Sequence, residues 1–376
     1  MTSSSLLKDA LSNVFPAGTE FTWNPAEVEP DERYLVIPNN RGPRWIIPKS
    51  PRLGLLALTQ WNPYFISQRV MWLALIAAYR TNMLGFLPKI ISFGASGATR
   101  LGWGHLGWSE SHAPIPVVIV RTEFDHKAVA TLVDPATQKP RIVAKIPIEG
   151  NSARMILNEA DTLTQLAEET PGLAPRLIFL DREQSISAQE FVYGRSSNHK
   201  LDREHFRLAT KLAREGRHIK LSDLVEGLVS RLNRIDNVDR NSKKLLEKIL
   251  PKIADQTRIP AVRIHGDFVP WNMHSTKDGG YVILDWEDSV PEGPPFYDLF
   301  HFLFKQAAIS NAKADICDKL AGYYFKSDYS KHLGISEAIF SKLLLYYLAS
   351  RLIKNLDVNG SRSRVIFYTK EILSLL

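Results

Sequence analysis

Two short segments between residues 264 and 287 constrain this chain more than any other feature. The first, Ile264–Met273, has the sequence IHGDFVPWNM, and the second, Val282–Glu287, has the sequence VILDWE. Asp267 and Asn272 stand five residues apart on one predicted loop, and Asp285 ends an apolar run that is typical of a short strand. We therefore expect a fold in which the strand runs beside the loop and the three side chains converge.

These side chains have the chemistry that phosphoryl transfer requires. A carboxylate must orient the attacking hydroxyl and accept its proton, and oxygen ligands must hold magnesium against the nucleotide phosphates. Magnesium prefers hard oxygen donors such as carboxylate and amide oxygens. We therefore predict Asp267 as the catalytic base, and Asn272 and Asp285 as the metal ligands. His265 is expected to brace the loop through hydrogen bonds rather than to transfer protons.

The two segments resemble the aminoglycoside phosphotransferase and choline kinase family, which uses HGDxxxxN as its catalytic loop and a second Asp on the strand that follows. The resemblance covers about residues 115–305. It implies a protein-kinase-like fold of the α+β class and an ATP- and magnesium-dependent kinase. The implied acceptor is a hydroxyl group of a small molecule such as a sugar, an amino sugar or an amino alcohol. The alternative is a chance HGD turn beside a strand that happens to end in Asp.

The residues before the loop support the same resemblance. Kinases hold the α- and β-phosphates with a Lys on the third strand, which pairs with a Glu on the next helix. Lys145 in the strand-like IVAK and Glu159 in the following helical segment match these positions. The segment QEFVYG resembles the hinge that meets adenine, and its alternative interpretation is a plain strand and turn. The predicted nucleotide contacts in it are Gln189, Glu190, Phe191 and Val192.

Two further positions follow from the resemblance. Asp298 matches an acidic residue that follows the DWE segment, and we expect it to tie the helical part of the chain to the catalytic loop. The loop expected to approach the phosphates, Thr122–Lys127, contains no glycine. Lys127 or backbone amides are the candidates to meet phosphate there.

Patterning divides the chain into three parts. Residues 1–110 form a basic N-terminal extension of unknown role, with a helix near residues 65–82. Residues 111–194 form a predicted nucleotide-binding lobe, because β-branched runs alternate with turn signals before a helix at 153–168. Residues 195–376 form a predicted helical lobe with the catalytic loop. Its first helices are predicted at residues 203–215, 221–235 and 241–255. Strands followed by helices indicate an α+β fold.

The extension has an unusual charge pattern. No Asp or Glu occurs between Arg33 and Ser109, whereas nine Lys and Arg residues do, against a net charge of +7 for the whole chain. A solvated basic face and a surface for a negatively charged partner are both consistent with this pattern. The apolar run Val70–Tyr79 is too short to span a bilayer, which needs about 20 residues. We expect it to form a buried helix, and the runner-up is a helix lying on anionic lipid.

Other features of the sequence bear on the cellular compartment and on alternative functions. The single cysteine, Cys317, excludes an internal disulfide and favours a reducing, cytoplasmic compartment, and no secretory signal is expected. No nucleic-acid-binding motif is present, and the sequence does not indicate an oligomeric state. The competing hypothesis is a catalytically silent nucleotide-binding protein that acts through its basic extension at a membrane or polyanion. The joint presence of all five residues that the reaction needs argues against that hypothesis: Asp267, Asn272, Asp285, Lys145 and Glu159.

Overall fold

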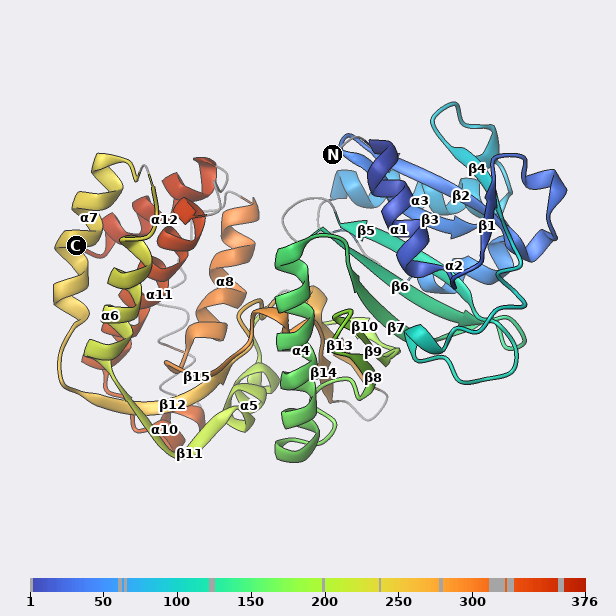
Figure 1. The fold of residues 1–376 in the computed structure, drawn as a ribbon. Coiled ribbons are helices and arrows are strands. Elements are labelled where there is room, and N and C mark those ends of the chain that lie inside the picture. The colour runs from blue at the N-terminus through green and yellow to red at the C-terminus, as the bar shows by residue number, and fades with distance from the viewer. Residues whose placement is uncertain are drawn as a thin grey trace. The chain divides into compact units, whose positions relative to one another are not determined.

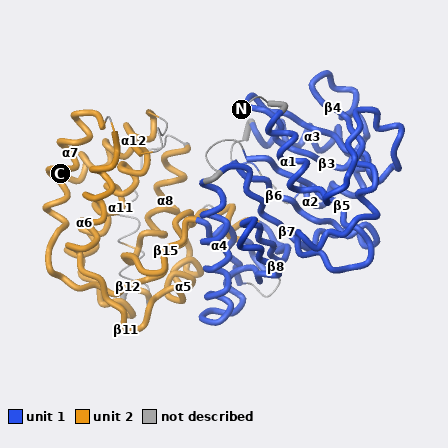
Figure 2. The backbone as a smooth tube through the Cα atoms, in the orientation of Figure 1, with its two compact units in different colours: residues 1–195, 274–287 blue, residues 196–273, 288–376 orange. Residues whose placement is uncertain are grey.

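The computed structural model describes residues 3–59, 63, 66–121, 126–197, 200–236, 238–276, 280–310, 322, 328–357 and 362–376. Their contacts divide the chain into two compact units (Figure 2). Unit 1 contains Met1–Arg195 together with His274–Glu287, and unit 2 contains Ser196–Met273 together with Asp288–Leu376. The extension and the predicted nucleotide-binding lobe thus lie in one unit. The three-part division made from the sequence stays a prediction.

Unit 1 is built on a nine-stranded antiparallel sheet in the order β1-β4-β2-β3-β5-β6-β7-β9-β8 (Figure 1). The strands are β1 Glu20–Thr22, β2 Arg33–Asn39, β3 Gly42–Pro48, β4 Ile91–Ser96, β5 Ile115–Arg121, β6 Lys127–Asp134, β7 Lys139–Pro147, β8 Leu177–Asp181 and β9 Ile186–Glu190. The helices are α1 Ser3–Val14, α2 Pro51–Thr59, α3 Ile66–Arg80 and α4 Gly150–Glu169. Because β3 pairs with β5, the extension continues the sheet of the nucleotide-binding part.

The register of β2 and β3 shows that helices cover both faces of this sheet. Trp45 pairs with Ile37, so these two side chains point to the same face. Ile37 is three residues from Tyr34 along β2, so Tyr34 and Trp45 point to opposite faces. Phe15, just after α1, packs edge-on against Tyr34 at 5.1 Å. Trp72 of α3 stacks on Trp45 at 5.1 Å. The sheet is therefore buried between α1 on one face and α3 on the other, which explains its nearly continuous apolar strands.

The helix α3 differs from the buried helix expected for Val70–Tyr79. Its inner side is buried, and the Tyr79 hydroxyl donates to the carbonyl oxygens of Pro48 and Ser50 at 2.6 and 3.0 Å. Its outer side exposes Val70 and Met71, so the expectation of a buried helix is wrong for that side. None of the described helices is long and apolar enough to cross a membrane.

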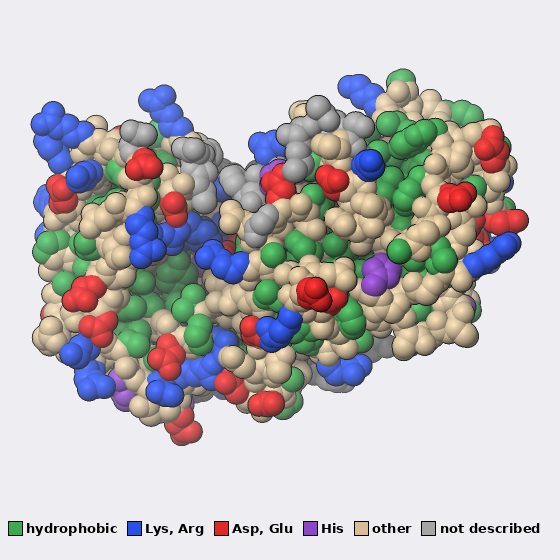
Figure 3. Space-filling model, in the orientation of Figure 1, with side chains coloured by type: hydrophobic (Ala, Val, Ile, Leu, Met, Phe, Trp, Pro, Cys, Tyr) green, Lys and Arg blue, Asp and Glu red, His purple; other side chains and the backbone are tan. Residues whose placement is uncertain are grey.

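Unit 2 is mainly helical. Its helices are α5 Arg203–Lys211, α6 Leu221–Leu232, α7 Arg240–Ile253, α8 Tyr297–Ser310, α10 Asp328–Leu333, α11 Glu337–Asp357 and α12 Arg362–Ser374. A sheet in the order β11-β12-β15 joins Ala213–Lys220, Arg258–Ile264 and Val290–Gly293. A further small sheet, β10-β13-β14, is formed by Arg195–Ser196, Met273–Ser275 and Tyr281–Ile283, most of whose residues belong to unit 1. Lys and Arg side chains are spread over the face of unit 2 that Figure 3 shows.

The sheet and helices confirm the predicted α+β class. One predicted helix is partly wrong. The helix at residues 203–215 ends at Lys211, and the chain then continues as β11, which pairs with β12. Gly216 has φ +69° within this segment, and the register between β11 and β12 shifts between Ala213 and His218. Strand pairing therefore overrides the helical pattern that the sequence suggests there.

Candidate active site

Lys145 occupies the centre of a buried charged cluster in unit 1. It lies on β7, and its Nζ is 2.6 Å from Oε2 of Glu159 on α4 and 2.6 Å from Oδ1 of Asp285. Burial lowers the pKa of Lys145, but the two carboxylates and Glu287 outweigh burial and raise that pKa above its ordinary value. The structure thus brings three predicted site residues together around one ammonium group.

Glu287 adds a second ion pair to this cluster. It accepts a hydrogen bond from Lys127 of β6, whose side chain is 0% exposed. Arg121 lies 3.8 Å from Asp285 and 4.0 Å from Glu287. Burial and the charge of Asp285 raise the pKa of Glu287 to about 7. Lys127 is thus paired with a carboxylate in this structure, and its predicted contact with phosphate stays a prediction. Residues 122–125 lie outside the described residues.

The turn that carries Asp285 is held by α4. Asp285 has φ +67°, a left-handed conformation that is uncommon for residues other than glycine. The Trp286 N–H donates to Glu159 at 3.3 Å, and the Asn158 side chain donates to the Glu287 carbonyl at 2.9 Å. Trp286 itself is fully buried. The helix therefore fixes the direction of both carboxylates that follow β14.

The predicted hinge begins at the end of β9. The N–H groups of Glu190 and Phe191 donate to the carbonyl oxygens of Arg176 and Arg141 at 3.0 and 2.9 Å. Gln189 is buried within the sheet. The peptide N–H groups of Glu190 and Phe191 are thus already hydrogen-bonded to backbone carbonyl oxygens. Among the predicted hinge residues, Val192 is the one whose peptide N–H makes no such bond in the described part of the chain.

The catalytic-loop segment of unit 2 is held by one carboxylate. Asp298, at the start of α8, accepts the N–H groups of His265 at 2.7 Å and Gly266 at 3.0 Å. Gly266 has φ +87°, and a Cβ built there lies 2.5 Å from the carbonyl oxygen of Asp288. The Asp267 N–H donates to Nδ1 of the buried His265 at 3.2 Å. The loop therefore needs glycine at 266 and imidazole at 265 to keep its form.

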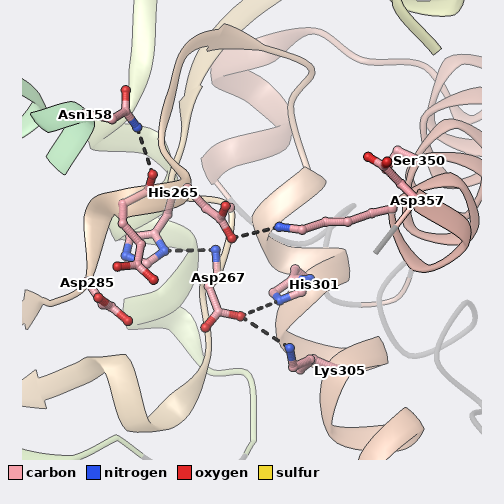
Figure 4. A network of polar contacts seen from close by, with 12 residues as sticks. Asn158, His265, Asp267, Asp285, His301, Lys305, Ser350 and Asp357 are labelled. Atoms are coloured by element: carbon pink, nitrogen blue, oxygen red, sulfur yellow. Dashed lines mark hydrogen bonds and ion pairs between the residues drawn. The ribbon is translucent and has the colours of Figure 1, made fainter. Parts of the chain in front are cut away.

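The Asp267 carboxylate lies among donors (Figure 4). His301 Nε2 lies 3.0 Å from Oδ1, Lys305 Nζ lies 3.6 Å from the same atom, and Asn272 Nδ2 lies 3.2 Å from Oδ2. Burial raises the pKa of Asp267, but the hydrogen bond from His301 and the charge of Lys305 outweigh it and hold that pKa well below its ordinary value. Asp267 is therefore ionised and able to accept a hydrogen bond from a hydroxyl group.

His301 and Lys305 were not singled out by sequence reasoning. Both lie on α8, at spacings of three and seven residues from Asp298, so all three share one helical face. Burial, together with the charge of Arg351, lowers the pKa of His301 to about 3, so His301 is neutral. Its partners assign the tautomer: Nε2–H donates to Asp267, and Nδ1 accepts from the Tyr347 hydroxyl at 3.2 Å. The helical spacing from Asp298 was the signal available in the sequence.

The donor groups suit magnesium in each unit. In unit 1, carboxylate oxygens of Glu159, Asp285 and Glu287 lie within 4.8 Å of one another. In unit 2, the Asn272 amide nitrogen donates to both the carbonyl oxygen and the carboxylate of Asp267, so the amide oxygen is left as a ligand. These are the hard oxygen donors that Mg²⁺ prefers. The roles of the individual residues stay predictions.

Comparison with known proteins decides the family. The family described as the phosphotransferase enzyme family matches residues 130–328, which is more than half of the chain. The chain belongs to this family. The match confirms the resemblance inferred from the two sequence segments, and phosphotransferase family members are small-molecule kinases. No curated protein sequence matches the chain.

Solved structures of similar fold include other phosphotransferases. The choline kinase LicA from Streptococcus pneumoniae is 15% identical, with 69% of this chain and 92% of that chain covered and a TM-score of 0.47. The GDP complex of aminoglycoside 2'-phosphotransferase-IIIa is 14% identical over 69% and 91%, with a TM-score of 0.45. A putative fructosamine-3-kinase from Thermobifida fusca is 15% identical over 69% and 93%, with a TM-score of 0.47.

Proposed function

We propose that this phosphotransferase is an ATP- and magnesium-dependent kinase that phosphorylates a hydroxyl group of a small molecule. One observation carries the proposal: the ammonium group of Lys145 lies 2.6 Å from both Glu159 and Asp285. A buried strand lysine between a helix Glu and a strand-end Asp is the arrangement that kinases use to hold nucleotide phosphates. Asp285 and Asn272 would hold magnesium, which would supply positive charge that neutralises the phosphates.

In this proposal each unit supplies one part of the chemistry. Lys145 binds the phosphates and is itself oriented by Glu159. Asp267 accepts a hydrogen bond from the acceptor hydroxyl and takes its proton as that oxygen bonds to the γ-phosphorus and the bond to the leaving phosphate breaks. His301 holds the Asp267 carboxylate in place. Val192 is the proposed backbone contact for adenine.

The first experiment measures magnesium-dependent ATP turnover with a panel of hydroxyl compounds. Asp267→Asn keeps the size of the side chain and removes the proton acceptor, so we expect a loss of turnover of about 100-fold or more with ATP affinity retained. Asp239→Asn is the matched control, because Asp239 caps α7 and Asn caps a helix equally well. Near-normal turnover in Asp267→Asn would remove Asp267 from the mechanism.

The second experiment concerns the metal. We expect Asp285→Asn to abolish the magnesium dependence of ATP binding in calorimetry, because the variant loses a charged ligand. An unchanged difference between binding with and without magnesium would contradict the proposed ligand.

The exposed side of α3 favours a second proposal, that unit 1 docks on an anionic bilayer surface. Met71 is 74% exposed and Leu73 is 65% exposed on a helix whose other side is also apolar. An open groove of about 500 Å³ beside α3 is rimmed by the cations Arg52, Arg80 and Lys139. A helix that is apolar on all sides is normally covered, and apolar side chains flanked by cations match the interface of anionic lipid.

Vesicle sedimentation tests this docking. We expect binding to vesicles that contain phosphatidylglycerol and little binding to pure phosphatidylcholine, because each cation near an anionic surface contributes about 1 kcal/mol. Leu73→Glu should abolish the binding, and Leu373→Glu should not, although Leu373 is 57% exposed on α12. The docking proposal fails if the vesicles are not bound, or if Leu73→Glu instead dissolves a dimer of the chain.

A further inference from the structure

Arg351 of α11 is a buried cation that forms no ion pair with any described residue, although the charge of Asp267 acts on it from a greater distance. Its side chain is only 7% exposed, and it lies near the phenol groups of Tyr297, Tyr347 and Tyr368. The Nε atom is enclosed and has no hydrogen-bond acceptor. Across the described part of the chain, no carboxylate lies within ion-pair distance of this guanidinium group.

Such a group is costly unless an anion satisfies it. A buried charge without a partner loses its hydration and gains no compensating ion pair. Burial raises the pKa of Tyr347 well above its ordinary value, so this phenol is neutral and does not balance the charge. Native proteins rarely leave a buried donor unused without a functional reason. The environment of Arg351 is therefore one that an anionic ligand completes.

The helical spacing places Arg351 beside the candidate catalytic base. Tyr347, Arg351 and Lys354 are spaced at four and three residues, so they lie on one face of α11. On this face the Tyr347 hydroxyl bonds His301, which bonds Asp267, and Lys354 bonds Asp288 at 2.8 Å. Arg351 lies between these two contacts.

Lys305 adds a second cation at the same place. Its Nζ lies 3.6 Å from Asp267, and its side chain is 21% exposed. Burial lowers the pKa of Lys305, and the charge of Asp267 raises it. The charges of Arg351, Arg364 and Lys354 lower that pKa further, so the net shift is downward. Lys305 and Arg351 are thus two cations that both interact with the Asp267 carboxylate. Unit 2 as a whole has 27 Lys and Arg against 19 Asp and Glu.

We propose that Arg351 and Lys305 bind an anionic group of the acceptor, so that the substrate is an alcohol that also carries a phosphate or a carboxylate. This inference rests on the proposed kinase function and narrows its acceptor. Arg binds both groups through paired N–H donors, and charged hydrogen bonds of this kind are the stronger ones. A cationic amino sugar or amino alcohol would meet like charge at this position.

Matched acceptors test the inference. Glycerol, glycerate and glycerol 3-phosphate form one series, glucose, glucuronate and glucose 6-phosphate a second, and glucosamine is the cationic comparison. We expect kcat/KM for an anionic member to exceed that of its neutral counterpart by about 10- to 100-fold, the effect of a hydrogen bond to a charged group. A comparison of kcat/KM between the carboxylate-bearing and the phosphate-bearing acceptors shows which of the two groups the site prefers. Preferred turnover of neutral or cationic acceptors overturns the inference and leaves the kinase function intact.

The variant Arg351→Met separates ligand binding from a structural role. We expect a higher Tm than wild type without ligand, because the variant removes an unpaired buried charge, and a loss of the stabilisation that phosphate or glucuronate gives the wild type. A structural arginine would instead lower Tm when replaced. Arg362→Met, at an exposed cation of α12, is the matched control. Lys305→Met provides a second variant if Arg351→Met does not fold.

Two readouts identify the source of the anion. If Arg351→Met raises KM for the anionic acceptor about tenfold or more and leaves KM for ATP unchanged, the acceptor is the ligand. If KM for ATP alone rises, the group binds the nucleotide and the inference is wrong. If no acceptor supports turnover, calorimetry with phosphate and glucuronate decides: binding that needs Arg351 supports the anion site although the kinase proposal has failed, and no binding overturns it.

Discussion

Removing the Lys127 ammonium group should destabilise unit 1 strongly. Lys127 is 0% exposed and bonds Glu287, so Lys127→Met leaves a buried carboxylate without its nearest cation. Breaking a buried ion pair from one side costs about 3–5 kcal/mol. Arg121 and Lys145, each 4.0 Å from Glu287, compensate in part. We therefore expect a loss of about 2–4 kcal/mol, which lowers Tm by roughly 5–12 °C for a unit of this size.

A double-mutant cycle measures the same interaction. The variant Lys127→Met combined with Glu287→Gln should recover part of the loss, with an interaction energy of about 1–3 kcal/mol in denaturant unfolding. Lys139→Met, at an exposed lysine of β7, is the control and should change stability by less than about 0.5 kcal/mol. If Tm of Lys127→Met stays within about 1 °C of wild type, or if the two single changes simply add, the reasoning from burial is refuted.

Substitutions at three further positions test the loop, its support and a separate ion pair of unit 2. Gly266→Ala should lower turnover at least about tenfold and cost about 1–3 kcal/mol, because its Cβ meets the Asp288 carbonyl at 2.5 Å at a positive φ; normal kinetics would contradict this. His301→Leu should lower kcat more than His301→Gln, which keeps a donor, and equal rates would show that the hydrogen bond is not needed. Asp255→Asn should cost about 1 kcal/mol at pH 7, because the hydrogen bond from Lys342 lowers the Asp255 pKa to about 2. Because the Asp255 pKa is lower in the folded protein, its ionised carboxylate stabilises the fold at pH values above the unfolded-state pKa of 3.8. This stabilisation is lost as the pH falls towards 2, so the unfolding free energies of the variant and the wild type should converge in acid.

The strands of the nucleotide-binding part were predictable from the sequence because their pattern is local. The β-branched runs at residues 117–121, 128–133 and 141–148 correspond to β5, β6 and β7 with boundaries shifted by a few residues. The strand β11 was missed because AREGRHIK is charged and mostly exposed, so it lacks the alternation that marks a half-buried strand. The pairing of β3 with β5 was also not predictable, because it joins segments about 70 residues apart and depends on tertiary packing.

The candidate site was predictable where residues belong to sequence segments of fixed spacing. Lys145, Glu159 and Asp285 were predicted to act together, and the structure brings them into contact. Their assigned roles stay predictions. His301 and Arg351 have no such segment, because they reach the base from separate helices whose packing the sequence does not specify.

The split composition of unit 1 has a consequence for the order in which the protein matures on the ribosome. Residues 274–287 belong to unit 1, but they are synthesised only after the 78 residues Ser196–Met273. Until they emerge, the buried ammonium groups of Lys127 and Lys145 lack Glu287 and Asp285 as partners. A nascent chain that ends near residue 195 therefore carries an incomplete, charge-unbalanced interior. The first unit to be translated is completed only when the catalytic loop has already left the ribosome.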